Sequence, residues 1–147
     1  MKKYLLSIMV VAISISLTLA QTPATIVTKF KTDYPEANAV EWKSDGELFT
    51  VTFTDRENMH HMIVYDEKGV IRSRESEVND ANVPSSIKEY YSSNYPQQKG
   101  SRVWLSENEA GNKVYYSPID DAVLFFDKDG KFSRQEPRTS EVMQPKN

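Results

Sequence analysis

The chain has 147 residues, of which 27% are charged, with a formal net charge of −3 and no cysteine. A mildly acidic chain without a basic cluster does not suit nucleic-acid binding, and the lack of cysteine excludes disulfide bonds, thiolate nucleophiles and cysteine metal ligands. The length predicts a single domain.

The first twenty residues have the features of a secretory signal peptide. Two lysines precede an apolar run at residues 4–19, and small residues mark a cleavage site after Ala20. The run is shorter than the ~20 residues of a membrane-spanning helix. We expect residues 1–20 to be removed. This leaves a periplasmic or secreted protein of residues 21–147, with a formal charge of −5, that does not insert into a membrane.

Residues 23–35 begin with proline and end in Tyr-Pro, and residues 84–96 repeat this pattern 61 positions later. Apolar residues recur four positions apart in each block, as on one helix face; they are Ile26, Phe30 and Tyr34, and then Ile87, Tyr91 and Tyr95. Each helix should end at its last tyrosine, because the following proline disfavours the helical conformation there. Thr22 is the expected N-cap of the first helix, with each opening proline in the first turn.

Short segments with strand-like alternation follow each predicted helix. They cover residues 40–43, 49–54, 59–65 and 70–75 in the first unit, and 102–106, 113–119, 122–126 and 131–135 in the second. Asp-Gly at positions 45–46 predicts a tight hairpin. The segments Asp66–Gly69 and Asp127–Gly130 have the composition of type I turns.

These elements predict an α+β fold made of two tandem α-β-β-β-β repeats, residues 21–76 and 84–136, in one domain spanning residues 21–136. About eight strands would form an antiparallel sheet with both helices covering one face, which leaves the other face open. Residues 137–147 are polar and are expected to form a flexible tail.

The order of these motifs resembles the PepSY-like, beta-lactamase-inhibitor-like family of exported bacterial proteins. The matching residues are Tyr34-Pro35, Val40-Glu41-Trp42, Phe53, Tyr65-Asp66, Gly69, Val83-Pro84, Tyr95-Pro96, Phe126-Asp127 and Gly130. The resemblance implies tandem α-β4 units whose joint sheet presents a curved face. In the inhibitor branch of the family, that face grips an enzyme.

No catalytic, cofactor or metal site is expected. His60 and His61 are neighbours on a strand, so their rings should point to opposite faces and not share a metal. The acids of Asp127–Gly130 are interpreted as turn residues, and Asp120-Asp121 as a hairpin loop. A hydrolase remains the weakest hypothesis, because no spacing brings a nucleophile and a base together.

Aromatic residues are the best candidates for a binding surface. If the aliphatic neighbours of Trp104 face a helix, Trp104 lies on the open face. Tyr115 and Tyr116 point to opposite faces, so one of them lies off the core. Trp104, Tyr115 and Tyr116 are therefore the candidate partner-binding residues, whereas Trp42 is expected in the core.

The sequence thus favours a non-catalytic binding module that holds an exported or envelope protein on its open sheet face, in an inhibitor-like manner. The alternative is a periplasmic small-ligand-binding or envelope-stress protein with a pocket between sheet and helices.

Overall fold

The computed structural model describes residues 21–98 and 101–138, and within them the chain forms two α-helices and one antiparallel sheet of eight strands. The strands follow one another across the sheet in chain order, from β1 at one edge to β8 at the other. The predicted α+β class is therefore confirmed. The predicted signal peptide, residues 1–20, and residues 139–147 of the predicted tail lie outside the described residues.

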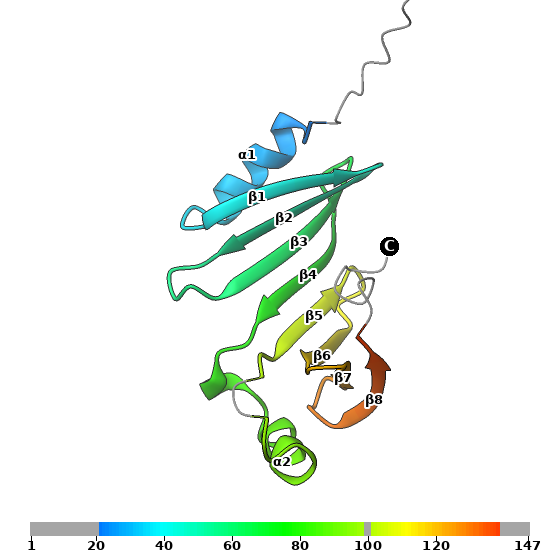
Figure 1. The fold of residues 1–147 in the computed structure, drawn as a ribbon. Helices are drawn as coiled ribbons and strands as arrows, with labels where there is room; N and C mark the ends of the chain where they lie inside the picture. The colour runs from blue at the N-terminus through cyan, green and yellow to red at the C-terminus, as the bar shows by residue number, and fades with distance from the viewer. Residues whose placement is uncertain (1–20, 99–100, 139–147) are drawn as a thin grey trace, which may run out of the picture.

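One helix followed by four strands occurs twice. The first unit consists of α1 (Ala24–Asp33), β1 (Asn38–Asp45), β2 (Leu48–Thr54), β3 (His60–Asp66) and β4 (Ile71–Glu77). A short 3-10 helix (Asp80–Asn82) leads to the second unit, which consists of α2 (Ser85–Asn94), β5 (Trp104–Asn108), β6 (Lys113–Pro118), β7 (Ala122–Phe126) and β8 (Phe132–Pro137). Figure 1 shows α1 at the β1 end of a strongly twisted sheet and α2 at the opposite end of the molecule. The last strand continues one residue into the predicted tail.

Both helices pack on the same face of the sheet. Cross-strand pairs connect one row of residues on that face, namely Phe53, His61, Ser76, Leu105, Tyr115 and Phe126. At one end of this row, α1 buries Ile26 and Phe30 against β2 and β3. At the other end, α2 buries Ile87 against β7. Within the described residues no helix covers the other face, which we call the open face.

The helices end as predicted, with Tyr34 and Tyr95 as the capping residues that follow the last turn. Their starts differ from the prediction. Pro23 is the N-cap of α1, and neither helix has a side-chain cap. The reason is that Pro23 adopts an extended conformation and its carbonyl accepts hydrogen bonds from the first free amides, those of Ile26 and Val27. Thr22 therefore lies one residue outside the helix.

Two equivalent Asp turns close the hairpins β3–β4 and β7–β8. The Oδ1 atom of Asp66 accepts hydrogen bonds from the amides of Lys68 and Val70, and Asp127 forms the same pair of bonds two and four residues ahead. These bonds hold the pKa of each carboxyl below its usual range, and the bonds from the amides of Val70 and Lys131 have the largest effect. The predicted turns are confirmed, and both carboxylates serve as backbone acceptors.

Trp42 packs against the first core as predicted, with its ring centroid 5.5 Å from that of Phe30.

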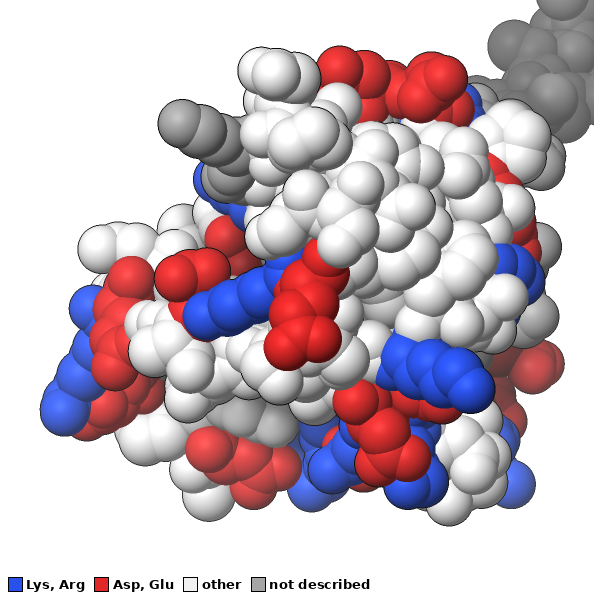
Figure 2. Space-filling model, turned by 90° about the horizontal axis from the view of Figure 1, so that it is seen from below, with Lys and Arg blue, Asp and Glu red and all other residues white. Residues whose placement is uncertain are grey.

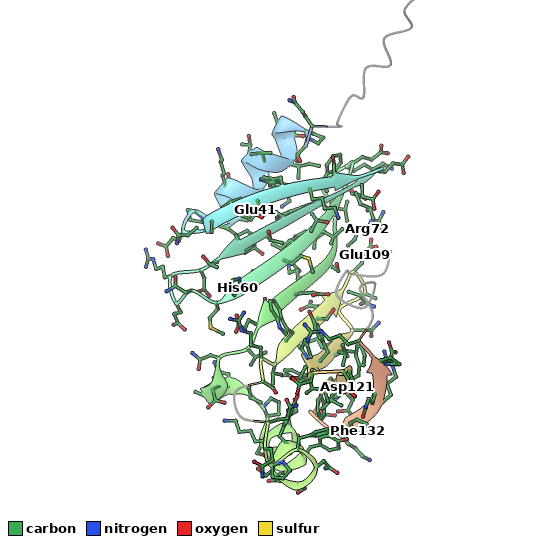
Figure 3. All side chains as sticks on the ribbon, viewed as in Figure 1. Glu41, His60, Arg72, Glu109, Asp121 and Phe132 are labelled. Atoms are coloured by element: carbon green, nitrogen blue, oxygen red, sulfur yellow. The ribbon has the colours of Figure 1, made fainter. Side chains whose placement is uncertain are left out.

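An ion pair joins Arg72 of β4 to Glu109 in the turn after β5 (Figure 3). Arg72 also contacts Asp66 at 2.9 Å. Arg72 therefore links the β3–β4 turn of the first unit to the second unit.

Candidate binding surface on the open sheet face

Three aromatic side chains form a transverse row on the open face of the second unit. Trp104 of β5 pairs with Tyr116 of β6, and Tyr116 pairs with Phe125 of β7. The Trp104 and Tyr116 rings are stacked, with centroids 6.2 Å apart and planes 11° apart. The Phe125 ring lies 6.2 Å from that of Tyr116. We call Trp104, Tyr116 and Phe125 the aromatic row; all three are partly exposed.

The alternation of the strands explains why the row faces away from the helices. Val103, the residue before Trp104, is buried in the core beneath α2. Because side chains alternate between faces along a strand, Trp104 points to the open face. The structure confirms the predicted open-face position of Trp104, and it shows that Tyr116 is the tyrosine that lies off the core. Tyr115 is different: it pairs with Leu105 and Phe126 and packs against the core beneath α2. The candidate Tyr115 therefore does not belong to the open face, because it is the tyrosine that the helix covers.

Phe125 is a member of the row that the sequence did not single out. Strand β7 is apolar at every position, so it shows no alternation from which to assign a face. The information lies in the pairing with β6, which places Phe125 opposite Tyr116. The hairpin around Asp120-Asp121 sets this register, and counting across it from Tyr116 would have found Phe125.

Charged groups lie at both ends of the aromatic row. The guanidinium carbon of Arg134 lies 4.1 Å from the ring centroid of Phe125, and its Nε atom is 2.7 Å from a carboxylate oxygen of Glu136. At the other end, the ring of His60 is 6.5 Å from that of Trp104. Glu77 pairs with Arg102 at 3.3 Å. Both the Arg134 guanidinium and the Glu77 carboxylate thus have an oppositely charged partner.

Glu75 lies beside the row, half-buried on the open face of β4. Its Oε2 atom accepts a 2.6 Å hydrogen bond from the hydroxyl of Tyr116. Burial raises the pKa of the Glu75 carboxyl above its ordinary value of 4.5, although the bond from Tyr116 acts in the opposite direction. Burial, followed by the nearby Glu75 charge, raises the pKa of Tyr116. The Tyr116 phenol is therefore neutral at neutral pH and donates its hydroxyl hydrogen to Glu75.

We expect Glu75→Gln to stabilise the protein at pH 7, because it removes the cost of burying a charged carboxyl. Because folding raises the pKa of Glu75, the stability contributed by its protonated form is complete below about pH 4.5 and is lost as the pH rises through the folded-state pKa. Glutamine does not ionise and can still accept the Tyr116 hydrogen bond. Urea unfolding of both proteins at pH 4 and pH 7 should show a gain that is present only at the higher pH.

Glu41→Gln is the matched control for this stability difference. Glu41 is exposed and lies on β1, at the far edge of the same face (Figure 3). Since Glu41 has no burial cost to relieve, its substitution should leave the free energy of unfolding nearly unchanged at both pH values. An equal effect of the two substitutions, or an effect of Glu75→Gln that is independent of pH, would contradict the assigned cause.

The two histidines lie on opposite faces, as predicted. His60 is on the open face, whereas His61 stacks on Phe53 of the first core. The His61 ring contacts Asp55 Oδ2 at 2.9 Å through Nε2 and Ser76 Oγ at 3.0 Å through Nδ1. The hydrogen bond to His61 holds the pKa of the Asp55 carboxyl below its usual range. Within the described residues, no three metal-ligating side chains gather at one place.

A groove lies between the 3-10 helix, the start of α2 and the start of β5. Its volume is about 590 Å³, and its apolar lining includes Val78, Val83, Ile87 and Val103. Asp80 and Lys88 at its rim are 3.8 Å apart. Figure 2 views the α2 end of the molecule, where a broad area of uncharged side chains is bordered by acidic and basic side chains.

Neither the known protein-family models nor the curated proteins include a match to this sequence. Solved structures from Bacteroides do share its fold. A BLIP-like protein from Bacteroides fragilis is 17% identical, with a TM-score of 0.63 over 86% of this chain and 95% of that chain. A DUF2874 family protein from Bacteroides uniformis is 14% identical, with a TM-score of 0.68 over 84% and 96% of the two chains.

A predicted periplasmic protein from Bacteroides eggerthii is also similar, at 12% identity and a TM-score of 0.67 over 80% of this chain and 89% of that chain. At such identities the likeness concerns the fold. The predicted resemblance to inhibitor-like proteins is therefore supported at the level of the fold. Within residues 21–98 and 101–138, no helix is both long and apolar enough to cross a membrane.

Proposed function

We propose that this chain is an exported, non-catalytic binding module that docks a protein partner on its open sheet face, with Trp104 and Tyr116 as anchors. The observation that carries the proposal is the aromatic row, which is partly exposed on the sheet face that neither helix covers. Aromatic side chains held in fixed positions bury large areas at little entropic cost, and they are enriched among the residues that dominate protein interfaces.

The likeness to a BLIP-like protein and to a predicted periplasmic protein supports this proposal. An N-terminal segment with the features of a signal peptide agrees with export to the periplasm or beyond. We also propose that the chain is a member of the PepSY-like, inhibitor-like group, on the basis of the motifs given above. The partner would then be another exported or envelope protein.

Trp104→Ala is expected to weaken partner binding by about 2 kcal/mol, or about thirtyfold, because it removes one of the two proposed anchor rings. The protein would be immobilised and exposed to an envelope extract of the source bacterium. The proteins that it retains would then be identified by mass spectrometry. The affinity of an enriched protein would then be measured by calorimetry for the wild type and the variant.

Phe132→Ala provides the matched control for ring removal. Phe132 is also an exposed aromatic residue, at 36% exposure, but it stacks on Tyr90 of α2 and so lies on the helix-covered face (Figure 3). This variant should retain the partner, and circular dichroism should show that both variants are folded. Equal capture by the Trp104 variant and the wild type would refute the anchor assignment.

The groove beside α2 favours a second candidate function, the binding of a small ligand. Its volume of about 590 Å³ lies within the range of small-molecule sites. A ligand that binds only the folded state raises the melting temperature, so a thermal-shift screen of envelope metabolites tests this candidate. A hit whose shift is abolished by Val83→Trp, which would fill the groove, would support it; a screen without any shift counts against it.

A further inference from the structure

Glu75 differs from the other acids beside the aromatic row. Among the described residues, no lysine, arginine or histidine forms an ion pair with its carboxylate, whereas Glu77 has Arg102 and Glu136 has Arg134. The Glu75 side chain is half-buried, so water compensates its charge only in part. A carboxylate in such a position costs stability unless a cation joins it.

The surroundings of Glu75 suit a cation. Its cross-strand partner on β5 is Ser106, whose small side chain fills little of the space above the sheet next to the Glu75 carboxylate. Tyr116 reaches over this position to donate its hydroxyl to Glu75, and Trp104 stacks on Tyr116. Aromatic ring faces attract ammonium and guanidinium groups, and the attraction is larger where water is partly excluded. A carboxylate and two rings therefore converge at one place.

We propose that the open face accepts a cationic side chain of the partner protein, with its ammonium or guanidinium group at Glu75 and its stem against Trp104 and Tyr116. This inference rests on the proposed function and specifies the chemistry of the contact. Arg134 does not compete for the site from within the chain, because it lies over Phe125 and pairs with Glu136. The carboxylate costs stability in the free protein and is neutralised in the complex.

Simple probes can test the inference before a partner is known. The protein expressed from the full-length sequence, labelled with ¹⁵N, would be titrated with Nα-acetyl-lysine methylamide and Nα-acetyl-arginine methylamide. Norleucine and citrulline derivatives of the same form are the neutral counterparts. The indole N–H signal of Trp104 reports on the site, and that of Trp42, which packs in the first core, is the internal reference.

We expect the cationic probes to shift the Trp104 signal in a saturable manner. The dissociation constants from these titrations should be about tenfold lower for the cationic probes than for the neutral ones. Glu75→Gln should weaken binding of the cationic probes by about tenfold. Glu41→Gln, which removes the same charge from the β1 end of the same transverse row, should not change it. Equal shifts by charged and neutral probes, no shift by any probe, or unchanged binding to the Glu75 variant would each overturn the inference.

The partner-capture experiment separates this inference from the proposed function. Capture that is lost with Trp104→Ala but retained in full with Glu75→Gln would preserve the binding module and reject the cation contact. Capture that survives both substitutions would reject the anchors and the cation contact together. Loss with both variants, while Glu41→Gln still captures the partner, is the result that we expect.

Discussion

Phe30→Ala is expected to lower the free energy of unfolding by about 3–5 kcal/mol. Phe30 is only 2% exposed and joins α1 to the sheet. Its ring centroid lies 5.4 Å from that of Tyr34, 5.5 Å from Trp42 and 5.1 Å from Phe53. Truncation removes the burial of the ring and leaves a cavity that three rigid aromatic neighbours do not readily fill. Guanidinium unfolding followed by circular dichroism measures the loss.

Phe132→Ala is the comparison that separates burial from residue type. Phe132 keeps 36% of its surface exposed, so its removal creates no closed cavity. Its stacking on Tyr90, with centroids 4.5 Å apart, is worth about 0.5–1.5 kcal/mol beyond the area that it buries. The loss should therefore be well below that of Phe30→Ala. Similar losses for the two variants would show that α1 does not depend on Phe30 for its attachment.

The core position of Phe30 could be predicted because the relevant information is local. Its spacing from Ile26 and Tyr34 defines one helix face, and proline after Tyr34 ends the helix. Trp104 could be placed for a similar reason, since its aliphatic neighbours in β5 must face the core. Alternation within one strand was sufficient in both cases.

The rest of the binding surface depends on pairing between strands, which local patterns do not reveal. Glu75 and Tyr116 are 41 residues apart and meet because β4 pairs with β5 across the connection between the two units. Phe125 lies in an apolar strand whose faces look alike in the sequence. The sequence identified Tyr115 and Tyr116 as opposed but contained no local signal to choose between them. That choice followed from Tyr115 packing against the core beneath α2.

Gly130→Ala should destabilise the protein by about 2–4 kcal/mol through two separate effects. Gly130 has a φ of +79°, which a residue with a Cβ atom adopts at a cost. In addition, an added Cβ would lie 2.5 Å from the Ser86 Oγ atom and 2.7 Å from the Pro84 Cβ atom at the start of α2. Because Pro84 is rigid, α2 or the β7–β8 hairpin must move. Urea unfolding measures the change.

Gly69→Ala isolates the contact with the helix, because the two glycines occupy equivalent turns. Gly69 has nearly the same backbone conformation, with φ of +76°, but its nearest neighbour to an added Cβ is an Ile26 side-chain carbon at 3.8 Å. Only the backbone cost of about 1–2 kcal/mol should remain. A larger loss for Gly130→Ala would show that α2 is seated directly on its hairpin, whereas α1 leaves space at the same point. Equal losses of unfolding free energy would mean that α2 or the hairpin moves aside at little cost, and that the contact between Gly130 and α2 does not contribute to stability.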